Sequence, residues 1–121
     1  MIKTKQRAWR WGLLAERLCI WLLRLKGYRI IATRYKTKKG EIDIIARRWG
    51  AISFIEVKAR PSIAQGMECI SSKQRQRICH AAQIFLSRSR KKDFNQLRFD
   101  VMVVVPWRLP YHLKNAWQLD K

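Results

Sequence analysis

The sequence predicts an α/β fold: a mixed β-sheet flanked by helices, in the order α-β-β-β-α-β with a short further strand. Two stretches, one near the N-terminus and one after residue 71, repeat apolar residues at helical spacing. Three short runs rich in β-branched and aromatic residues lie between them, and a fourth follows the second helical stretch. The length of 121 residues fits a single domain over residues 1–121, with a basic N-terminal extension over about residues 1–8.

The first predicted element is a helix over about residues 4–26, a range that contains no proline. Gly27 suits the C-cap position that ends it. Its apolar residues recur at helical spacing: Leu14, Leu18, Trp21, Leu22 and Leu25. More apolar residues lie on its other side, so we expect this helix to be covered on more than one face.

Three strands follow, over residues 28–34, 41–47 and 51–58. The connections between them are short and contain the turn-forming residues Gly40 and Gly50. Short connections join antiparallel neighbours, so the three strands should form an antiparallel meander. A loop that contains Gly66 is expected after them.

Ser71 or Ser72 is the predicted N-cap of the second helix. Its apolar stripe consists of Ile70, Ile78, Ala81, Ala82, Phe85 and Leu86. A largely buried strand over residues 98–105 then ends at Pro106, because proline lacks the amide hydrogen that a sheet requires. A short edge strand over residues 115–119 completes the expected order.

Positive charge dominates the composition. The chain has 27 Lys and Arg against 8 Asp and Glu, a formal charge of +19. Nucleic acid is the expected partner, because cationic side chains release the counterions condensed on a phosphate backbone. An anionic membrane surface or a basic structural protein would suit the same composition, but either alternative leaves the acidic residues described below unexplained.

The cysteines and the N-terminus indicate a cytoplasmic protein that does not enter a membrane. The three cysteines include no Cys-x-x-Cys pair, so we expect buried, reduced thiols rather than disulfides or a zinc site. His80 and His112 are also too far apart in sequence to suggest zinc. The apolar stretch from Leu18 to Leu25 is interrupted by Arg24 and is much shorter than the roughly 20 residues of a membrane span.

Acidic residues gather on two adjacent predicted strands, although the chain has few of them. Side chains alternate along a strand, so Glu41 and Asp43 should share one face, opposite Ile42 and Ile44. Glu56 and Lys58 should likewise share a face of the next strand, opposite Ile55 and Val57. Two acids and a lysine can therefore converge.

Carboxylate oxygens are the ligands that Mg²⁺ or Mn²⁺ prefers, and Mg²⁺ often takes only one or two of them. Asp43 and Glu56 supply that number, and Lys58 could orient a water or offset charge that develops at phosphorus. The alternative is a set of ordinary ion pairs among these residues. Four tryptophans could stack on unpaired bases, although most tryptophans are packing residues: Trp9, Trp11, Trp49 and Trp107.

The motifs as a set resemble the YraN family, over a match from about Gly12 to Trp117. They are Gly40-Glu41-Ile42-Asp43-Ile44-Ile45-Ala46, Phe54-Ile55-Glu56-Val57-Lys58-Ala59-Arg60 and Arg98-Phe99-Asp100-Val101. That family is assigned to the PD-(D/E)xK restriction-endonuclease-like superfamily and is similar in outline to archaeal Holliday-junction resolvases. The resemblance implies a restriction-endonuclease-like fold. Tyr35 departs from the family pattern, where asparagine is common.

The resemblance also implies roles for single residues. In Gly12-Leu13-Leu14-Ala15-Glu16, the glutamate matches the helical glutamate that completes the metal site of the resolvases. Glu16, Asp43 and Glu56 then correspond to the metal ligands and Lys58 to the catalytic lysine, while Glu41 belongs to the motif without a clear role as a ligand. For Asp100 we expect a structural role.

These observations predict a metal-dependent endonuclease that hydrolyses DNA phosphodiester bonds, with branched or junction DNA as a substrate implied by the resemblance. RNA stays an alternative nucleic acid, and a symmetric junction would favour a homodimer. The alternative function is a nucleic-acid-binding module with little or no turnover. The predicted nucleic-acid contacts are Arg34, Lys38, Lys39, Arg60, Lys73, Arg75 and Arg77.

Overall fold

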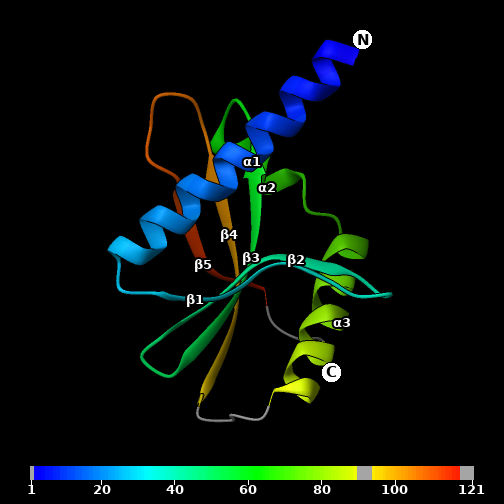
Figure 1. Ribbon diagram of the computed structural model, residues 1–121, viewed down its shortest axis with the longest axis vertical. Coiled ribbons are helices and arrows are strands. Elements are labelled where there is room, and N and C mark those ends of the chain that lie inside the picture. Colours follow the sequence, from blue (N-terminus) through cyan, green and yellow to red (C-terminus); the bar gives the residue numbers. More distant parts are fainter. Residues whose placement is uncertain (1, 90–93, 118–121) are drawn as a thin grey trace.

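The computed structural model describes residues 2–89 and 94–117, with side chains from residue 11 onward. Its elements are α1 (Ile2–Leu25), β1 (Arg29–Lys36), β2 (Glu41–Arg48), β3 (Ala51–Ala59), α2 (Ile63–Glu68), α3 (Ser72–Arg88), β4 (Gln96–Val104) and β5 (Tyr111–Trp117). The strands form a sheet in the order β1-β2-β3-β4-β5 (Figure 1). The predicted α/β class and the order of the main elements are confirmed.

The sheet is mixed because one of its pairs is parallel. β1, β2 and β3 form the predicted antiparallel meander. β3 and β4 run parallel over their whole lengths, from Ala51 opposite Gln96 to Ala59 opposite Val104. Parallel neighbours need a crossover connection, and the chain supplies it with α2 and α3.

The segment expected to be a loop around Gly66 contains the short helix α2 instead. Ser62 is its N-cap, and the Ser62 Oγ accepts a hydrogen bond from the amide of Gln65 at 3.2 Å. Gly66 is buried against Val103, whose side chain leaves no room for a Cβ at this position. The helix is therefore held by its packing on β4, a contact that local spacing does not reveal.

The final strand is longer than the sequence indicated and begins earlier. β5 covers Tyr111–Trp117, whereas the predicted strand covered residues 115–119, of which 118 and 119 lie outside the described residues. β5 pairs antiparallel with β4 from Tyr111 opposite Val103 to Trp117 opposite Phe99. β5 contains several polar residues, so its sequence lacks the apolar run that would predict a strand paired with β4.

The two faces of the sheet have separate cores. Alternate residues of β3 serve the two sides, so that Ile55 packs with Cys19 and Leu23 of α1, while Phe54 packs with Ile78 of α3. All five side chains are at most 2% exposed. Burying each large apolar side chain contributes about 1.5 to 3 kcal/mol, so these two clusters fix both helices on the sheet.

One face of α1 is buried and the opposite face is not. Ala15, Cys19 and Leu23 are inaccessible, but a stripe of large apolar residues is 42–64% exposed: Leu14, Leu18, Trp21 and Leu25. The expectation that α1 is covered on more than one face is therefore wrong within the described residues. A helix that lies on a sheet buries one side only. No helix in the described chain is long and apolar enough to cross a membrane.

Asp100 joins the two last strands, which is the structural role expected for it. The side chain is inaccessible to solvent. Its Oδ1 accepts a hydrogen bond from the amide of Asn115, and its Oδ2 lies 2.8 Å from Nε2 of His112. The pairing of β4 with β5 shifts register between Phe99 and Val101, so the carboxylate holds β5 where the regular ladder is interrupted.

Asp100→Ala should lower the free energy of unfolding by about 2 to 3 kcal/mol. The substitution leaves the Asn115 amide and the His112 ring without the acceptor they now share, and unpaired buried polar groups cost about 1 to 3 kcal/mol each. Urea denaturation measures the change. The control is Glu68→Ala, which removes an exposed acid and should change stability by less than about 0.5 kcal/mol. Equal stabilities of the two variants would contradict this role.

Candidate active site

Asp43 lies where β2 and β3 separate. The pairing of these strands ends at Ile44 opposite Ile55. Beyond it, the amide of Val57 donates to Asp43 Oδ2 at 2.8 Å. The aspartate thus takes the place of a backbone acceptor and is held at the open end of the strand pair.

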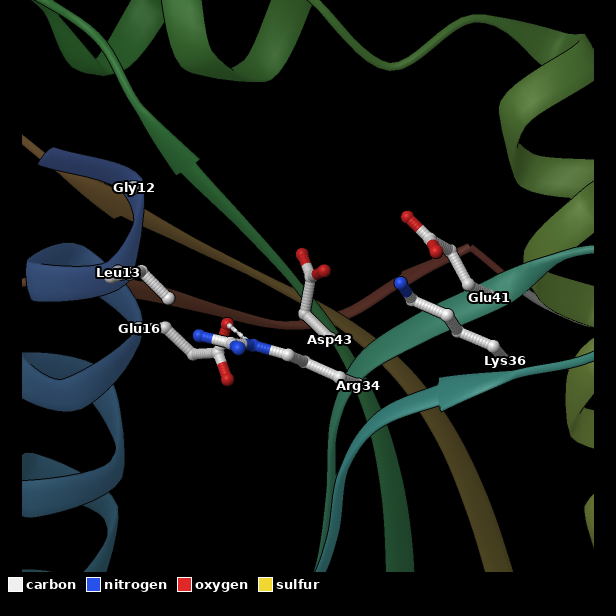
Figure 2. A pocket seen from close by; sticks show the side chains of 7 residues that line it. All are labelled: Gly12, Leu13, Glu16, Arg34, Lys36, Glu41 and Asp43. Carbon is white, nitrogen blue, oxygen red and sulfur yellow. Dashed lines mark hydrogen bonds and ion pairs between the residues drawn. The ribbon is translucent and has the colours of Figure 1, made fainter. Parts of the chain in front are cut away.

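Strict alternation along β2 also breaks at this point. Ile42 packs with the α3 cluster, whereas Ile44 packs with the α1 cluster. The prediction that these two isoleucines share a face is therefore wrong. Glu41 and Asp43 nevertheless line the same cleft, as expected (Figure 2). The break coincides with the end of the regular pairing of β2 with β3, where Asp43 accepts the hydrogen bond from the Val57 amide.

Glu56 and Lys58 lie beside each other at the end of β3. Lys58 Nζ is 3.3 Å from Glu56 Oε1, and the side chains are 15% and 9% exposed. Ile55 and Val57 pack on the α1 side, so the predicted alternation holds on this strand. The structure brings Glu56 and Lys58 together with Asp43. Glu56 is buried and Asp43 is partly buried.

Sequence reasoning missed Gln74, which contacts this group from α3. Its Nε2 donates to Glu56 Oε1 at 3.0 Å. Ser71 is the N-cap of α3, and its Oγ accepts a hydrogen bond from the Gln74 amide. A Gln at this spacing usually indicates a capping box, in which its side chain turns back to the cap, so the motif hides the contact with β3.

Burial sets the electrostatics of the two acids. Removal from water raises the pKa of Asp43, while the hydrogen bond from the Val57 amide opposes that rise. Burial, and then the neighbouring Asp43, raise the pKa of Glu56 to about 8, against the opposing effect of Lys58. Two carboxylates that are largely removed from water therefore share one nearby ammonium group, and another cation or a proton would relieve their repulsion.

Glu16 reaches the same cleft from α1, where Figure 2 shows it facing Arg34. Arg34 Nε is 3.4 Å from Glu16 Oε2, which is long for a charge-assisted hydrogen bond. Arg34 has a φ of 50° inside β1, a left-handed conformation that costs a residue with a side chain about 1 to 2 kcal/mol. Such strain is typical of residues whose direction matters for function.

The cleft beside Glu16, Arg34 and Asp43 is open and has a volume of about 310 Å³. It is lined by Gly12, Leu13, Glu16, Arg34, Lys36, Glu41 and Asp43. Three acids face two cations across it, in a protein whose remaining surface is strongly basic. A cation bound at the acids and a phosphate bound at Arg34 and Lys36 would be adjacent.

The other predicted nucleic-acid contacts are spread over the fold. Lys38 and Lys39 are exposed in the β1–β2 turn, and Lys73, Arg75 and Arg77 are exposed on α3. Gly40 lies against the backbone of Arg77, with no room for a Cβ. That contact places the β1–β2 turn on α3 and makes the two lysines neighbours of the basic helix.

Arg60 differs from these because its guanidinium is engaged locally. It donates to Cys69 Sγ at 3.0 Å and to the carbonyl of Ala59 at 2.8 Å. Cys69 and Cys79 are only partly buried, so the expectation of three buried thiols holds for Cys19 alone. Burial raises the pKa of Cys19 to about 12, which keeps that thiol protonated and unreactive.

A divalent ion fits the donors of this site in part. Among the described residues, no three side chains of His, Cys, Asp or Glu are already arranged as a metal cage. Asp43 and Glu56 nevertheless provide two adjacent carboxylates, and Mg²⁺ commonly binds to one or two carboxylates while it keeps several waters. Asp43 and Glu56 would hold a hydrated Mg²⁺ or Mn²⁺ ion, and Glu16 lines the same cleft as Asp43.

Comparison with known proteins places most of the chain in one family. A model described as "Uncharacterised protein family UPF0102" matches residues 15–104. A UPF0102 protein of Mesorhizobium japonicum is 46% identical over 114 residues, which cover 94% of this chain and 91% of that protein. A UPF0102 protein of Bartonella bacilliformis is 42% identical over 118 residues, which cover 96% of this chain and 95% of that protein. Glu16, Asp43, Glu56 and Lys58 all lie within the matched region.

Proposed function

This chain belongs to the protein family UPF0102, the YraN family that its motifs resemble, and we propose that it is a metal-dependent endonuclease acting on DNA. One observation carries the proposal: two adjacent carboxylates, the buried Glu56 and the partly buried Asp43, lie near the ammonium group of Lys58 in an otherwise strongly basic protein. Ordinary structural ion pairs do not need two acids in contact away from water, because their repulsion costs stability.

In the proposed reaction Asp43 and Glu56 hold a Mg²⁺ or Mn²⁺ ion, with Glu16 as a further ligand. When bound, the ion supplies Lewis-acid activation of the phosphodiester and of the attacking water. Lys58 orients that water or offsets negative charge developing at phosphorus. Arg34, half exposed beside Glu16, binds a neighbouring phosphate of the same strand.

Branched or junction DNA is the proposed substrate, by the resemblance to the resolvases. A four-way junction is symmetric, so a homodimer would place two equivalent sites on it. The basic β1–β2 turn and α3 would then contact the phosphates that flank the cut. These contacts give affinity without reading sequence, and the charge of +19 suits such binding.

The second candidate is a nucleic-acid-binding module that has little turnover. A specific observation favours it: two of the acids assigned to the metal site, Glu16 and Glu56, already have partners in the protein. Glu16 pairs with Arg34, and Glu56 contacts Lys58 and Gln74. In this case the acids would orient basic side chains, and no metal would be needed.

Cleavage assays separate the two candidates. Labelled four-way junction, flap, single-stranded and linear duplex DNA are incubated with Mg²⁺, Mn²⁺ or EDTA. The nuclease proposal expects nicks that require a divalent ion and fall preferentially on branched DNA. Tight binding in all three conditions without any cut would favour the binding module.

Gln74→Ala should raise the Mg²⁺ concentration needed for half-maximal cleavage about tenfold. The variant removes the donor that orients Glu56, and groups that orient metal ligands typically contribute ten- to a hundredfold to metal affinity. Metal titrations of the cleavage rate measure the shift. Gln76→Ala is the matched control, because Gln76 is exposed on the same helix. An equal Mg²⁺ requirement for both variants would argue against this role of Gln74.

A further inference from the structure

A second pocket, which is basic, lies at the opposite end of the sheet from the acidic cleft. It has a volume of about 450 Å³ and is lined by Arg48, Trp49, Ala51, Gln96, Arg98, Lys114 and Asn115. Three of these residues are cationic and none is acidic. We propose that this pocket binds unpaired nucleotides, with phosphates at its cationic side chains and a base stacked on Trp49.

Positive charge is concentrated here without a compensating acid in the lining. Arg48 Nη1 donates to the carbonyl of Lys26 at 3.1 Å, which brings the end of α1 to the same place. Burial lowers the pKa of the Lys26 ammonium group, and the nearby charges of Lys114 and Arg48 lower it further. Like charges that repel one another in this way gain from binding a polyanion, because its phosphates remove the repulsion.

Trp49 supplies the stacking surface. Its side chain is 87% exposed, so the protein core does not need it. The guanidinium carbon of Arg48 lies 4.4 Å from the centre of the Trp49 ring and 4.4 Å from that of Tyr28. Arg48 thus connects the indole to the folded part of the protein, and the exposed ring can take a base as a single-strand-binding protein does.

The backbone at Trp49 supports the same conclusion. Trp49 and Gly50 have φ values of 51° and 78° between the paired residues Arg48 and Ala51. Two-residue hairpins with positive φ at both positions favour Asn-Gly or Asp-Gly, and a bulky residue at the first position is an outlier. Folding alone does not explain a tryptophan in this strained and exposed position. Trp107 has a similar φ and exposure, but Trp49 differs from it because it lines a pocket with three cationic side chains.

The pocket is distinct from the acidic cleft. Ala51 lines the pocket at the start of β3, and Lys58 lies near the other end of that strand. Seven residues of β-strand extend roughly 23 Å. A nucleic acid that reaches both the pocket and the cleft must therefore be several nucleotides long. The inference goes beyond the proposed function, since the pocket can hold a single strand whether or not the cleft cuts it.

The test measures binding in EDTA by fluorescence anisotropy. The probes are labelled oligothymidylate and oligouridylate of about twelve nucleotides, and a DNA duplex of the same length. Trp49→Asn removes the ring but suits the positive φ of the turn, and Trp49→Tyr keeps an aromatic ring. Trp107→Ala is the matched control, because Trp107 is also fully exposed with a φ of 65°.

Trp49→Asn should weaken binding to a single strand about tenfold and to the duplex less than twofold, because only unpaired bases offer a free face. Trp49→Tyr should restore most of the affinity, and Trp107→Ala should leave it unchanged. The affinities of wild type for oligothymidylate and oligouridylate are compared, and the tighter of the two shows whether the pocket prefers DNA or RNA. Lys114→Gln should lower the slope of log affinity against log salt concentration by about one.

Three results would overturn the proposal: unchanged single-strand binding by Trp49→Asn, equal losses on single strand and duplex, or an equal loss in Trp107→Ala. Thermal melting of each variant shows whether the fold is intact. Because the assay contains no divalent ion, its outcome is independent of cleavage. A protein that passes this test and cuts no DNA would refute the nuclease proposal and leave this one standing.

Discussion

Asp43→Asn is expected to lower the rate of metal-dependent DNA cleavage by about a hundred- to a thousandfold. A loss of this size is typical when one electrostatic contact to the transition state is removed. The affinity for DNA should stay within about twofold of wild type. The amide oxygen can still accept the hydrogen bond from Val57, so the local fold should survive. The substitution removes only the negative charge, and the affinity of the site for the divalent ion should fall as a result.

Lys58→Ala should have a similar effect on the cleavage rate for a different reason. It removes the ammonium group beside Glu56 without removing a metal ligand. The control for both variants is Glu68→Gln, an exposed acid on α2 that should cut like wild type. Normal cleavage by Asp43→Asn and Lys58→Ala would show that the nuclease site lies elsewhere.

Glu56→Gln should stabilise the metal-free protein at pH 8 by an amount on the order of 4 kcal/mol. Burial first, and Asp43 next, raise the pKa of Glu56 to about 8 in the folded protein, from 4.5 for the ordinary group. Each unit of difference corresponds to about 1.4 kcal/mol, so ionising this acid in the folded state is costly. The neutral amide keeps the size of the side chain and avoids that cost.

The sign of the pH dependence follows from the raised pKa. Between pH 4.5 and about 8 the folded protein binds a proton at Glu56 that the unfolded chain has lost. The contribution of Glu56 to the free energy of unfolding is therefore fully present below pH 4.5, and it is lost as the pH rises through about 8. Urea denaturation of wild type in EDTA should show this decline, and Glu56→Gln should show much less of it.

Added Mg²⁺ provides a second measurement on the same pair. A cation that binds the ionised carboxylates stabilises the folded state by mass action, so the melting temperature of wild type at pH 8 should rise with Mg²⁺. Glu56→Gln should respond less. An equal rise in both proteins would mean that Mg²⁺ binds at some other place, and a flat pH profile of wild type would contradict the raised pKa.

Local patterns in the sequence were sufficient for much of the fold. The periodicity of α1 and α3 predicted both helices, because a helix repeats its apolar residues every three to four positions. The short turn at Trp49 and Gly50 predicted that β2 and β3 are neighbours. The same turn predicted that Asp43 and Glu56 lie close together, since adjacent antiparallel strands align such residues.

Other parts of the site depend on residues far apart in the chain. Gln74 reaches Glu56 across eighteen positions, and its spacing from Ser71 is that of a capping box rather than of a contact with β3. Arg34 meets Glu16 from a strand residue with positive φ, for which the sequence contains no glycine signal. Neither contact repeats with a period, so no local pattern could predict it.

The sequence by itself indicated the family through its motifs. It also predicted the order of the main elements and the group formed by Asp43, Glu56 and Lys58, because apolar periodicity and short turns are local properties. Only the tertiary structure decided which face of α1 is buried, that β3 and β4 run parallel, and that Arg98 and Lys114 join Trp49 in one pocket. These features depend on which surfaces pack together, and packing is settled by contacts between distant segments.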